Sequence, residues 1–127
     1  MVTLKFTTRA ANDPAYVITV GLSRPLKDAF ADMEKTKVNK IGRKLTKYLS
    51  YRVAGALIKN GYELPLPEGY LLRVRGEVTF DYNEEGGEIN VSVKGAKLSI
   101  DIYKREKSIS YSEGTLEHSI ERSTAEK

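Results

Sequence analysis

Two long stretches of alternating apolar and polar residues, joined by a glycine-containing turn, constrain the fold of this 127-residue chain most strongly. Successive side chains of a β-strand point to opposite faces, so alternation predicts a strand with one buried face. The segment 83–87 between the stretches supplies turn residues. The apolar positions of the two stretches are Leu72, Val74, Val78, Phe80 and Tyr82, then Ile89, Val91, Val93, Leu98, Ile100 and Ile102. The sequence therefore predicts one long antiparallel hairpin.

The second stretch changes phase after Val93. A β-bulge, one extra residue near Ala96-Lys97, would return the later apolar residues to the inner face. In this register Phe80 lies opposite Val91. The alternative is a tight turn over 94–97 that begins a further strand, because glycine also marks turns.

The first twenty residues contain two shorter alternations, and each predicts a strand. The apolar positions are Val2, Leu4 and Phe6, then Tyr16, Ile18 and Val20. Turn-forming residues occupy 10–14 between them. We therefore expect an N-terminal hairpin.

The segment from Ser23 to Lys59 shows the spacing of an amphipathic helix and ends at Asn60-Gly61, residues that commonly end helices. The apolar stripes of its two halves are rotated relative to each other, so we expect a break or kink near Lys35-Thr36. The apolar stripe of the second half is Val38, Ile41, Leu45, Tyr48, Leu49, Val53 and Ala56.

These elements predict an α+β domain in the order β-β-α-α-β-β, with an antiparallel sheet built from two hairpins and a kinked helical segment packed on one face. We assign residues 1–105 to this single domain. Residues 106–127 are rich in serine and glutamate and poor in apolar residues, so we expect a flexible tail there.

The net charge of +4 is unevenly distributed along the chain. Residues 24–59 carry ten basic and three acidic residues, a net charge of +7, and residues 60–127 carry nine basic and thirteen acidic residues, a net charge of −4. The window from Lys35 to Tyr62 holds eight cations and no acidic residue. Such a concentration of one sign indicates an interaction surface for a polyanion.

Within this window, cations recur at spacings of three or four residues, which places them on one face of the expected helix. The row is Lys37, Lys40, Lys44, Lys47 and Tyr51, with Arg43 beside it. Lysine and arginine would contact phosphates and release counterions, and the tyrosine would stack on a base. The alternative is a solvated face neutralised by acidic residues elsewhere in the chain.

Arg73 and Arg75 point away from the apolar side of the long hairpin and lack an obvious acidic partner in the sequence. We favour structural charge pairing within the sheet for this face, as for Glu77 opposite Lys94. The alternative is that the two arginines extend the basic surface and contact nucleic acid.

No catalytic constellation emerges from the sequence. The chain has no cysteine, and its glycines form no phosphate-binding motif. Glu77, Asp81 and Asp101 are the only candidates for paired acid chemistry, and basic residues interleave them. His118 stands in the expected tail without candidate ligands. We therefore expect no enzymatic activity, no cofactor and no metal.

The sequence thus predicts a small non-enzymatic nucleic-acid-binding protein. The alternative is a protein-interaction or assembly module, such as a viral or accessory subunit, whose basic helix binds an acidic protein. No apolar run reaches the roughly 20 residues of a membrane-spanning helix, so we expect no membrane partner and a cytoplasmic location. Edge strands allow a homodimer. Abundant lysine and glutamate with no glutamine is a composition typical of thermophiles.

Overall fold

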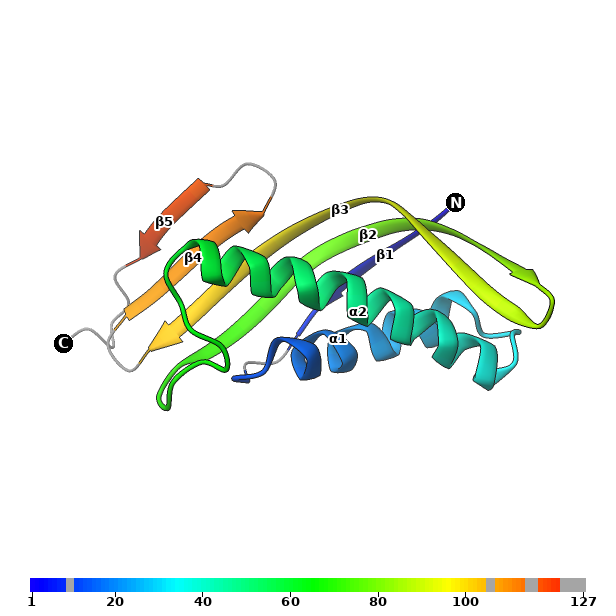
Figure 1. The fold of residues 1–127 in the computed structure, drawn as a ribbon, viewed down its shortest axis with the longest axis horizontal. Helices are drawn as coiled ribbons and strands as arrows, with labels where there is room; N and C mark the ends of the chain where they lie inside the picture. Colours follow the sequence, from blue (N-terminus) through cyan, green and yellow to red (C-terminus); the bar gives the residue numbers. More distant parts are fainter. Residues whose placement is uncertain (9–10, 105–106, 114–116, 122–127) are drawn as a thin grey trace.

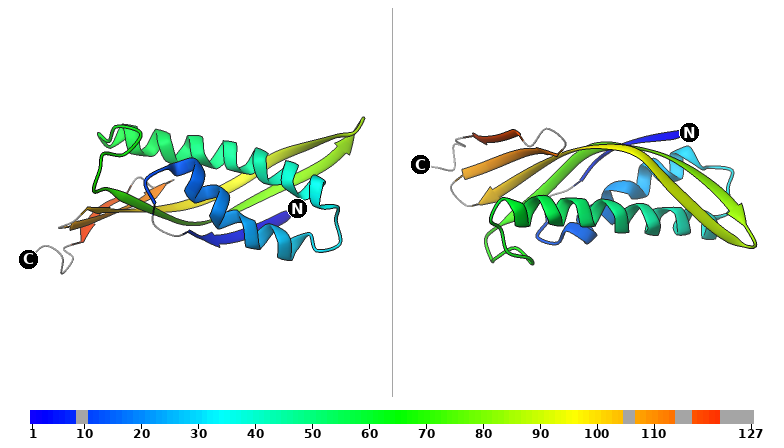
Figure 2. Two further views of the ribbon diagram at one scale, coloured as in Figure 1. Left: turned by 90° about the horizontal axis from the view of Figure 1, so that it is seen from below. Right: turned by 45° about the horizontal axis from the view of Figure 1, so that its top comes forward.

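The chain folds into two helices packed on one face of an antiparallel sheet, so the expected α+β class is confirmed (Figures 1 and 2). The computed structural model describes residues 1–8, 11–104, 107–113 and 117–121, with side chains up to 103. The elements in chain order are β1 (Val2–Thr7), α1 (Pro14–Ala29), α2 (Lys35–Lys59), β2 (Leu71–Glu85), β3 (Glu88–Lys104), β4 (Lys107–Glu113) and β5 (Glu117–Glu121). The five strands stand in the sheet in the order β1-β2-β3-β4-β5.

The expected N-terminal hairpin is wrong, because its second half is helix α1 rather than a strand. Asp13 caps this helix by accepting a hydrogen bond from the backbone N–H of Ala15 at 3.1 Å, and Pro14 occupies the first turn. The buried residues of α1 follow helical spacing: they are Pro14, Val17, Ile18, Gly21, Leu22 and Leu26. Tyr16 and Val20, which completed the apparent alternation, lie on the exposed side of the helix.

β1 pairs instead with β2, which follows both helices in the sequence, so these two strands lie side by side (Figure 1). Val2 lies opposite Phe80 and Leu4 opposite Val78 in this antiparallel pair. The observed order is therefore β-α-α-β-β-β-β, which corrects the expected β-β-α-α-β-β.

The long hairpin is present as β2 and β3, in a register shifted by two residues from the expected one. The turn is tighter than expected, because Gly86 and Gly87 both adopt positive φ, at 61° and 82°, and form a two-residue turn. Phe80 consequently lies opposite Val93 rather than Val91. A shift of two leaves every side chain on its predicted face.

The hairpin contains the expected extra residue, but two positions earlier than predicted. Phe80 pairs with Val93 while Thr79 pairs with Gly95, so Lys94 is the additional residue of β3. The strand continues unbroken through 94–97, and the alternative of a turn at this point is wrong.

The C-terminal segment departs from the expected flexible tail. Lys107–Glu113 and Glu117–Glu121 are strands β4 and β5, which extend the sheet beyond β3 (Figure 1). Extended pairing satisfies their backbone groups without requiring many apolar residues, so composition alone gave little sign of them. The remainder of the expected tail lies outside the described residues.

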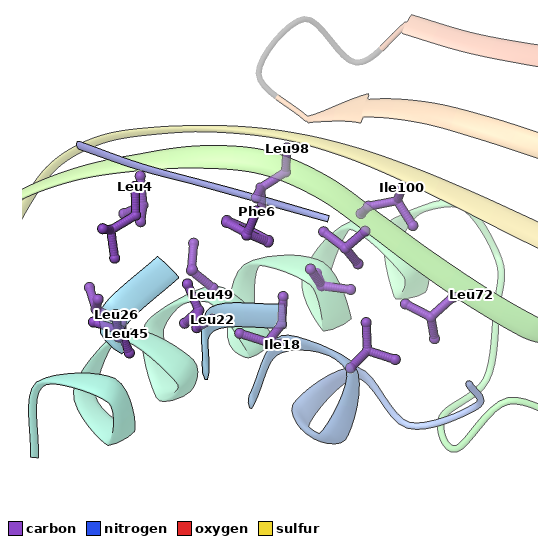
Figure 3. Close-up of a cluster of buried hydrophobic side chains, with 14 of the residues drawn as sticks. Leu4, Phe6, Ile18, Leu22, Leu26, Leu45, Leu49, Leu72, Leu98 and Ile100 are labelled. Atoms are coloured by element: carbon purple, nitrogen blue, oxygen red, sulfur yellow. The ribbon is translucent and has the colours of Figure 1, made fainter. Parts of the chain in front are cut away.

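The core lies between the sheet and the two helices (Figure 3). α2 contributes a stripe of fully buried residues, namely Ile41, Leu45, Leu49, Val53 and Leu57, which confirms the predicted apolar face and adds its last member. Each buried leucine or isoleucine stabilises the fold by about 1.5–3 kcal/mol. The predicted break between the helices is also confirmed, because α1 ends at Ala29 and α2 begins at Lys35.

Candidate nucleic-acid interface

Four cations of α2 form an exposed row on the side of the helix opposite its buried stripe. They are Lys40, Arg43, Lys44 and Lys47, here called the basic ridge, and all four are exposed. Within the described part of the chain, none of them forms an ion pair with a carboxylate. The buried leucines of α2 fix the rotation of the helix, and this rotation presents the ridge to solvent. Tyr51 continues the row and is 68% exposed.

Lys37, the first member of the predicted row, forms an ion pair with another part of the chain. Its ammonium nitrogen lies 2.9 Å from Oε2 of Glu84 at the tip of the long hairpin. This hydrogen bond and the negative charge of Glu84 raise the pKa of Lys37 above its usual value. The side chain of Lys37 stays 38% exposed, but its charge is paired with Glu84, so it is not a free cation like the four residues of the basic ridge.

Arg73 and Arg75 do not extend the basic ridge. They alternate along β2 with the buried residues Leu72 and Val74, which face the helices, so they lie on the opposite face of the sheet. The expectation that they lack an acidic partner is also wrong. The buried carboxylate of Asp101 lies 3.3 Å from Nη2 of Arg75 and 4.0 Å from Nε of Arg73.

The two arginines therefore have a structural role in the outer face of the sheet. The side chain of Asp101 is only 7% exposed, whereas those of Arg73 and Arg75 are 42% and 54% exposed. Arg73 also donates a hydrogen bond to the hydroxyl of Tyr103 and lies over its ring, 5.4 Å from the centroid. These contacts agree with charge pairing within the sheet and not with an extended basic surface.

A groove of about 810 Å³ runs between α1 and α2 on the solvent side of the helix layer. Its deepest residues, Leu22 and Leu26, belong to the core. Most of its lining is apolar, with Ala15, Phe30, Met33 and Val38 beside the two leucines. Hydroxyl and amide side chains lie among them, namely Thr19, Ser23, Asn39, Thr46 and Ser50. Four cations line it as well, Lys27, Lys35, Arg43 and Lys47, and the described residues that line it include no carboxylate.

Two of these cations, Lys27 and Lys35, were missed in the sequence. Lys27 lies in the last turn of α1 and Lys35 begins α2, and only the antiparallel packing of the two helices brings them to one groove. The sequence predicted a positively charged segment that contains both lysines. It did not predict that α1 forms one side of the groove, because the first residues of α1 show the alternation of a strand.

The three candidate acidic residues are dispersed into separate ion pairs. Glu77 lies 4.0 Å from the ammonium group of Lys97 rather than pairing with Lys94, and Asp81 lies 3.3 Å from the N-terminal amine. The described residues contain no group of three potential metal ligands. Neither described helix is long and apolar enough to cross a bilayer.

No family model, curated protein or solved structure shows significant similarity to this chain. The geometry and charge of the basic ridge and of the α1–α2 groove are therefore the features that bear on function.

Proposed function

We propose that this protein binds nucleic acid through the basic ridge of α2 and has no enzymatic activity. One observation carries the proposal: four exposed cations share one helix face with no ion-pair partner among the described residues. Like charges at three- and four-residue spacings repel, at about 0.2–0.5 kcal/mol per pair. A polyanion placed along the ridge would relieve this repulsion.

The spacing of the ridge suits a phosphate backbone. Residues 40 to 47 span about 10 Å of helix at 1.5 Å per residue, so several phosphates of one strand lie within reach of flexible lysine side chains. Each phosphate contact releases condensed counterions and adds affinity that does not depend on base sequence. The proposal therefore predicts general, salt-sensitive binding.

Fluorescence anisotropy with labelled DNA and RNA at low salt tests the proposal. We expect the double variant Lys40→Gln, Lys44→Gln to bind at least about tenfold more weakly than the wild type, because two phosphate contacts are lost. The matched control is Lys94→Gln with Lys97→Gln on β3, which removes the same charge from the sheet layer. It should retain wild-type affinity within about twofold.

Absence of binding at low salt, or equal weakening by the two double variants, contradicts the proposal. The alternative of an acidic protein partner would use the same ridge. In a pull-down from lysate, an acidic protein that stays bound after nuclease treatment, and is lost from the Lys40→Gln, Lys44→Gln variant, would favour that alternative. The protein would then show no affinity for DNA or RNA.

A further inference from the structure

Two exposed tyrosines flank one end of the α1–α2 groove. Tyr16 of α1 is 61% exposed and Tyr51 of α2 is 68% exposed. Neither is a lining residue: each lies one position after one, Ala15 or Ser50, so its side chain is turned by about 100° around the helix axis from the groove wall, toward solvent. Because α1 and α2 run in opposite directions side by side (Figure 1), the start of α1 and the second half of α2 meet at this end. Neither tyrosine makes a ring contact or side-chain hydrogen bond within the described part of the chain.

The groove between the tyrosines and the α1–α2 turn offers donors suited to phosphate oxygens. Arg43 and Lys47 belong both to the basic ridge and to the groove, and Lys27 and Lys35 lie toward the other end. Hydroxyl and amide side chains stand between these cations. A channel lined by cations with exposed aromatic rings nearby is the arrangement that tracks a single strand.

A duplex does not fit these features. Packed helices lie about 8–10 Å apart, so the groove between them is too narrow to admit a double helix. A duplex also keeps its bases stacked on one another and paired, so their faces cannot reach an aromatic ring. Unpaired bases can stack on tyrosine whatever their identity.

We propose that the α1–α2 groove binds single-stranded nucleic acid, with phosphates along Arg43 and Lys47 and bases stacked on Tyr16 and Tyr51. This inference rests on the proposed function and names its ligand class. It makes α1 a part of the site, whereas the basic ridge alone involves only α2.

Anisotropy titrations with oligothymidylate and oligouridylate of about 12 nucleotides, and with a duplex of the same length, test the inference. We expect the single strands to bind at least about tenfold more tightly than the duplex. Tyr16→Leu and Tyr51→Leu should each weaken single-strand binding by about 5- to 150-fold, because base stacking contributes about 1–3 kcal/mol. Neither change should alter the salt dependence, since no charge is removed. Tyr103→Leu, on the sheet face opposite the helices, is the control and should leave single-strand affinity unchanged.

Ser23→Glu tests the groove independently of the tyrosines, because it places a carboxylate on the α1 wall and leaves α2 unchanged. It should weaken single-strand binding by at least about fivefold, because the new carboxylate repels the phosphates of the bound strand. Ser92→Glu makes the same substitution at an exposed position of β3 and should not.

The outcomes separate the two proposals. Duplex binding as tight as single-strand binding, or wild-type affinity in the tyrosine and Ser23→Glu variants, overturns the single-strand inference while the basic ridge remains a nucleic-acid site. If neither DNA nor RNA of any form binds, the proposed function itself fails.

Discussion

Gly21 of α1 sits at the tightest contact between the helix layer and the segment that follows β1, and its replacement by alanine provides a sharp test of the packing. A β-carbon at this position would lie 2.4 Å from Cγ2 of Thr8, far inside van der Waals contact. Thr8 is buried, and its hydroxyl accepts a hydrogen bond from the N–H of Val74 at 2.8 Å. Its methyl group therefore cannot turn away without breaking that bond.

The expected change in unfolding free energy combines the cost of relieving this overlap, by one of two routes, with the higher helix propensity of alanine. Rotation of Thr8 would leave a buried backbone N–H unsatisfied, at a cost of about 1–3 kcal/mol. Movement of α1 instead would overpack the core at a similar cost. Because the overlap exceeds 1 Å, we expect a cost near the upper end of both ranges, about 3 kcal/mol. Alanine recovers about 1 kcal/mol through its higher helix propensity, so Gly21→Ala should destabilise the protein by about 2 kcal/mol.

Urea unfolding monitored by circular dichroism measures this effect, and Thr8→Ser supplies the decisive background. Serine keeps the hydroxyl and removes the methyl group, and the other nearest atoms to a β-carbon at Gly21 lie at 3.4 and 3.6 Å, ordinary contact distances. In that background Gly21→Ala should be neutral or stabilising by up to about 1 kcal/mol. Gly55→Ala is the helix control, since nothing lies within 4 Å of its added β-carbon, and it should stabilise by about 0.5–1 kcal/mol. An equal penalty for Gly21→Ala in both backgrounds would show that the methyl group of Thr8 is not the cause.

Three further predictions concern the sheet and its arm. Gly76→Ala should destabilise by about 2–3 kcal/mol in urea unfolding, because the added carbon would lie 2.3 Å from the carbonyl oxygen of Lys97, a backbone atom that cannot rotate away; wild-type stability would contradict the β2–β3 geometry. The Lys37–Glu84 pair raises the folded pKa of Lys37 above its usual 10.5, so its stabilisation is present below that pH and is lost as the pH rises through the raised pKa. The melting temperature of Glu84→Gln should therefore fall slightly below that of the wild type near pH 8 and converge with it as the pH rises through the raised pKa of Lys37, and a gap that persists at higher pH would exclude this pair as its cause. Asp101→Asn should cost about 1–3 kcal/mol in unfolding free energy without changing nucleic-acid affinity, because it removes the buried negative charge that pairs with Arg73 and Arg75 on the face opposite the helices; a change in affinity would place that face in the interface.

The sequence correctly predicted the elements in which a helical or strand pattern of apolar residues repeats over many residues. The stripe through Leu45 and Leu49 identified α2 and its orientation, and a helix of this length repeats the pattern often enough to exclude a strand. The alternation of β2 and β3 likewise predicted both faces of the hairpin. Their register was off by two residues, because alternation is unchanged by such a shift and only the turn geometry at Gly86-Gly87 decides it.

The missed features depend on local chemistry or on tertiary contacts. Asp13-Pro14 is a helix cap followed by a first-turn proline, and this signal competed with a three-residue apolar alternation that proved incidental. Asp101 is distant in sequence from the arginines it pairs with, and Glu84 is distant from Lys37. Only the folded sheet brings such partners together, so charge runs in the sequence could not distinguish free cations from paired ones. All four residues of the basic ridge belong to the predicted row of cations, and Lys37, which also belongs to that row, is paired with Glu84.

The salt dependence of single-strand binding shows whether the cations of the basic ridge contact phosphates. If the four cations of the basic ridge contact phosphates, the logarithm of the association constant should fall with the logarithm of salt concentration with a slope of about −3. Replacing Lys40 and Lys44 by glutamine should reduce the magnitude of this slope by about 1.4. A slope near zero, or one that the double replacement leaves unchanged, would contradict the account.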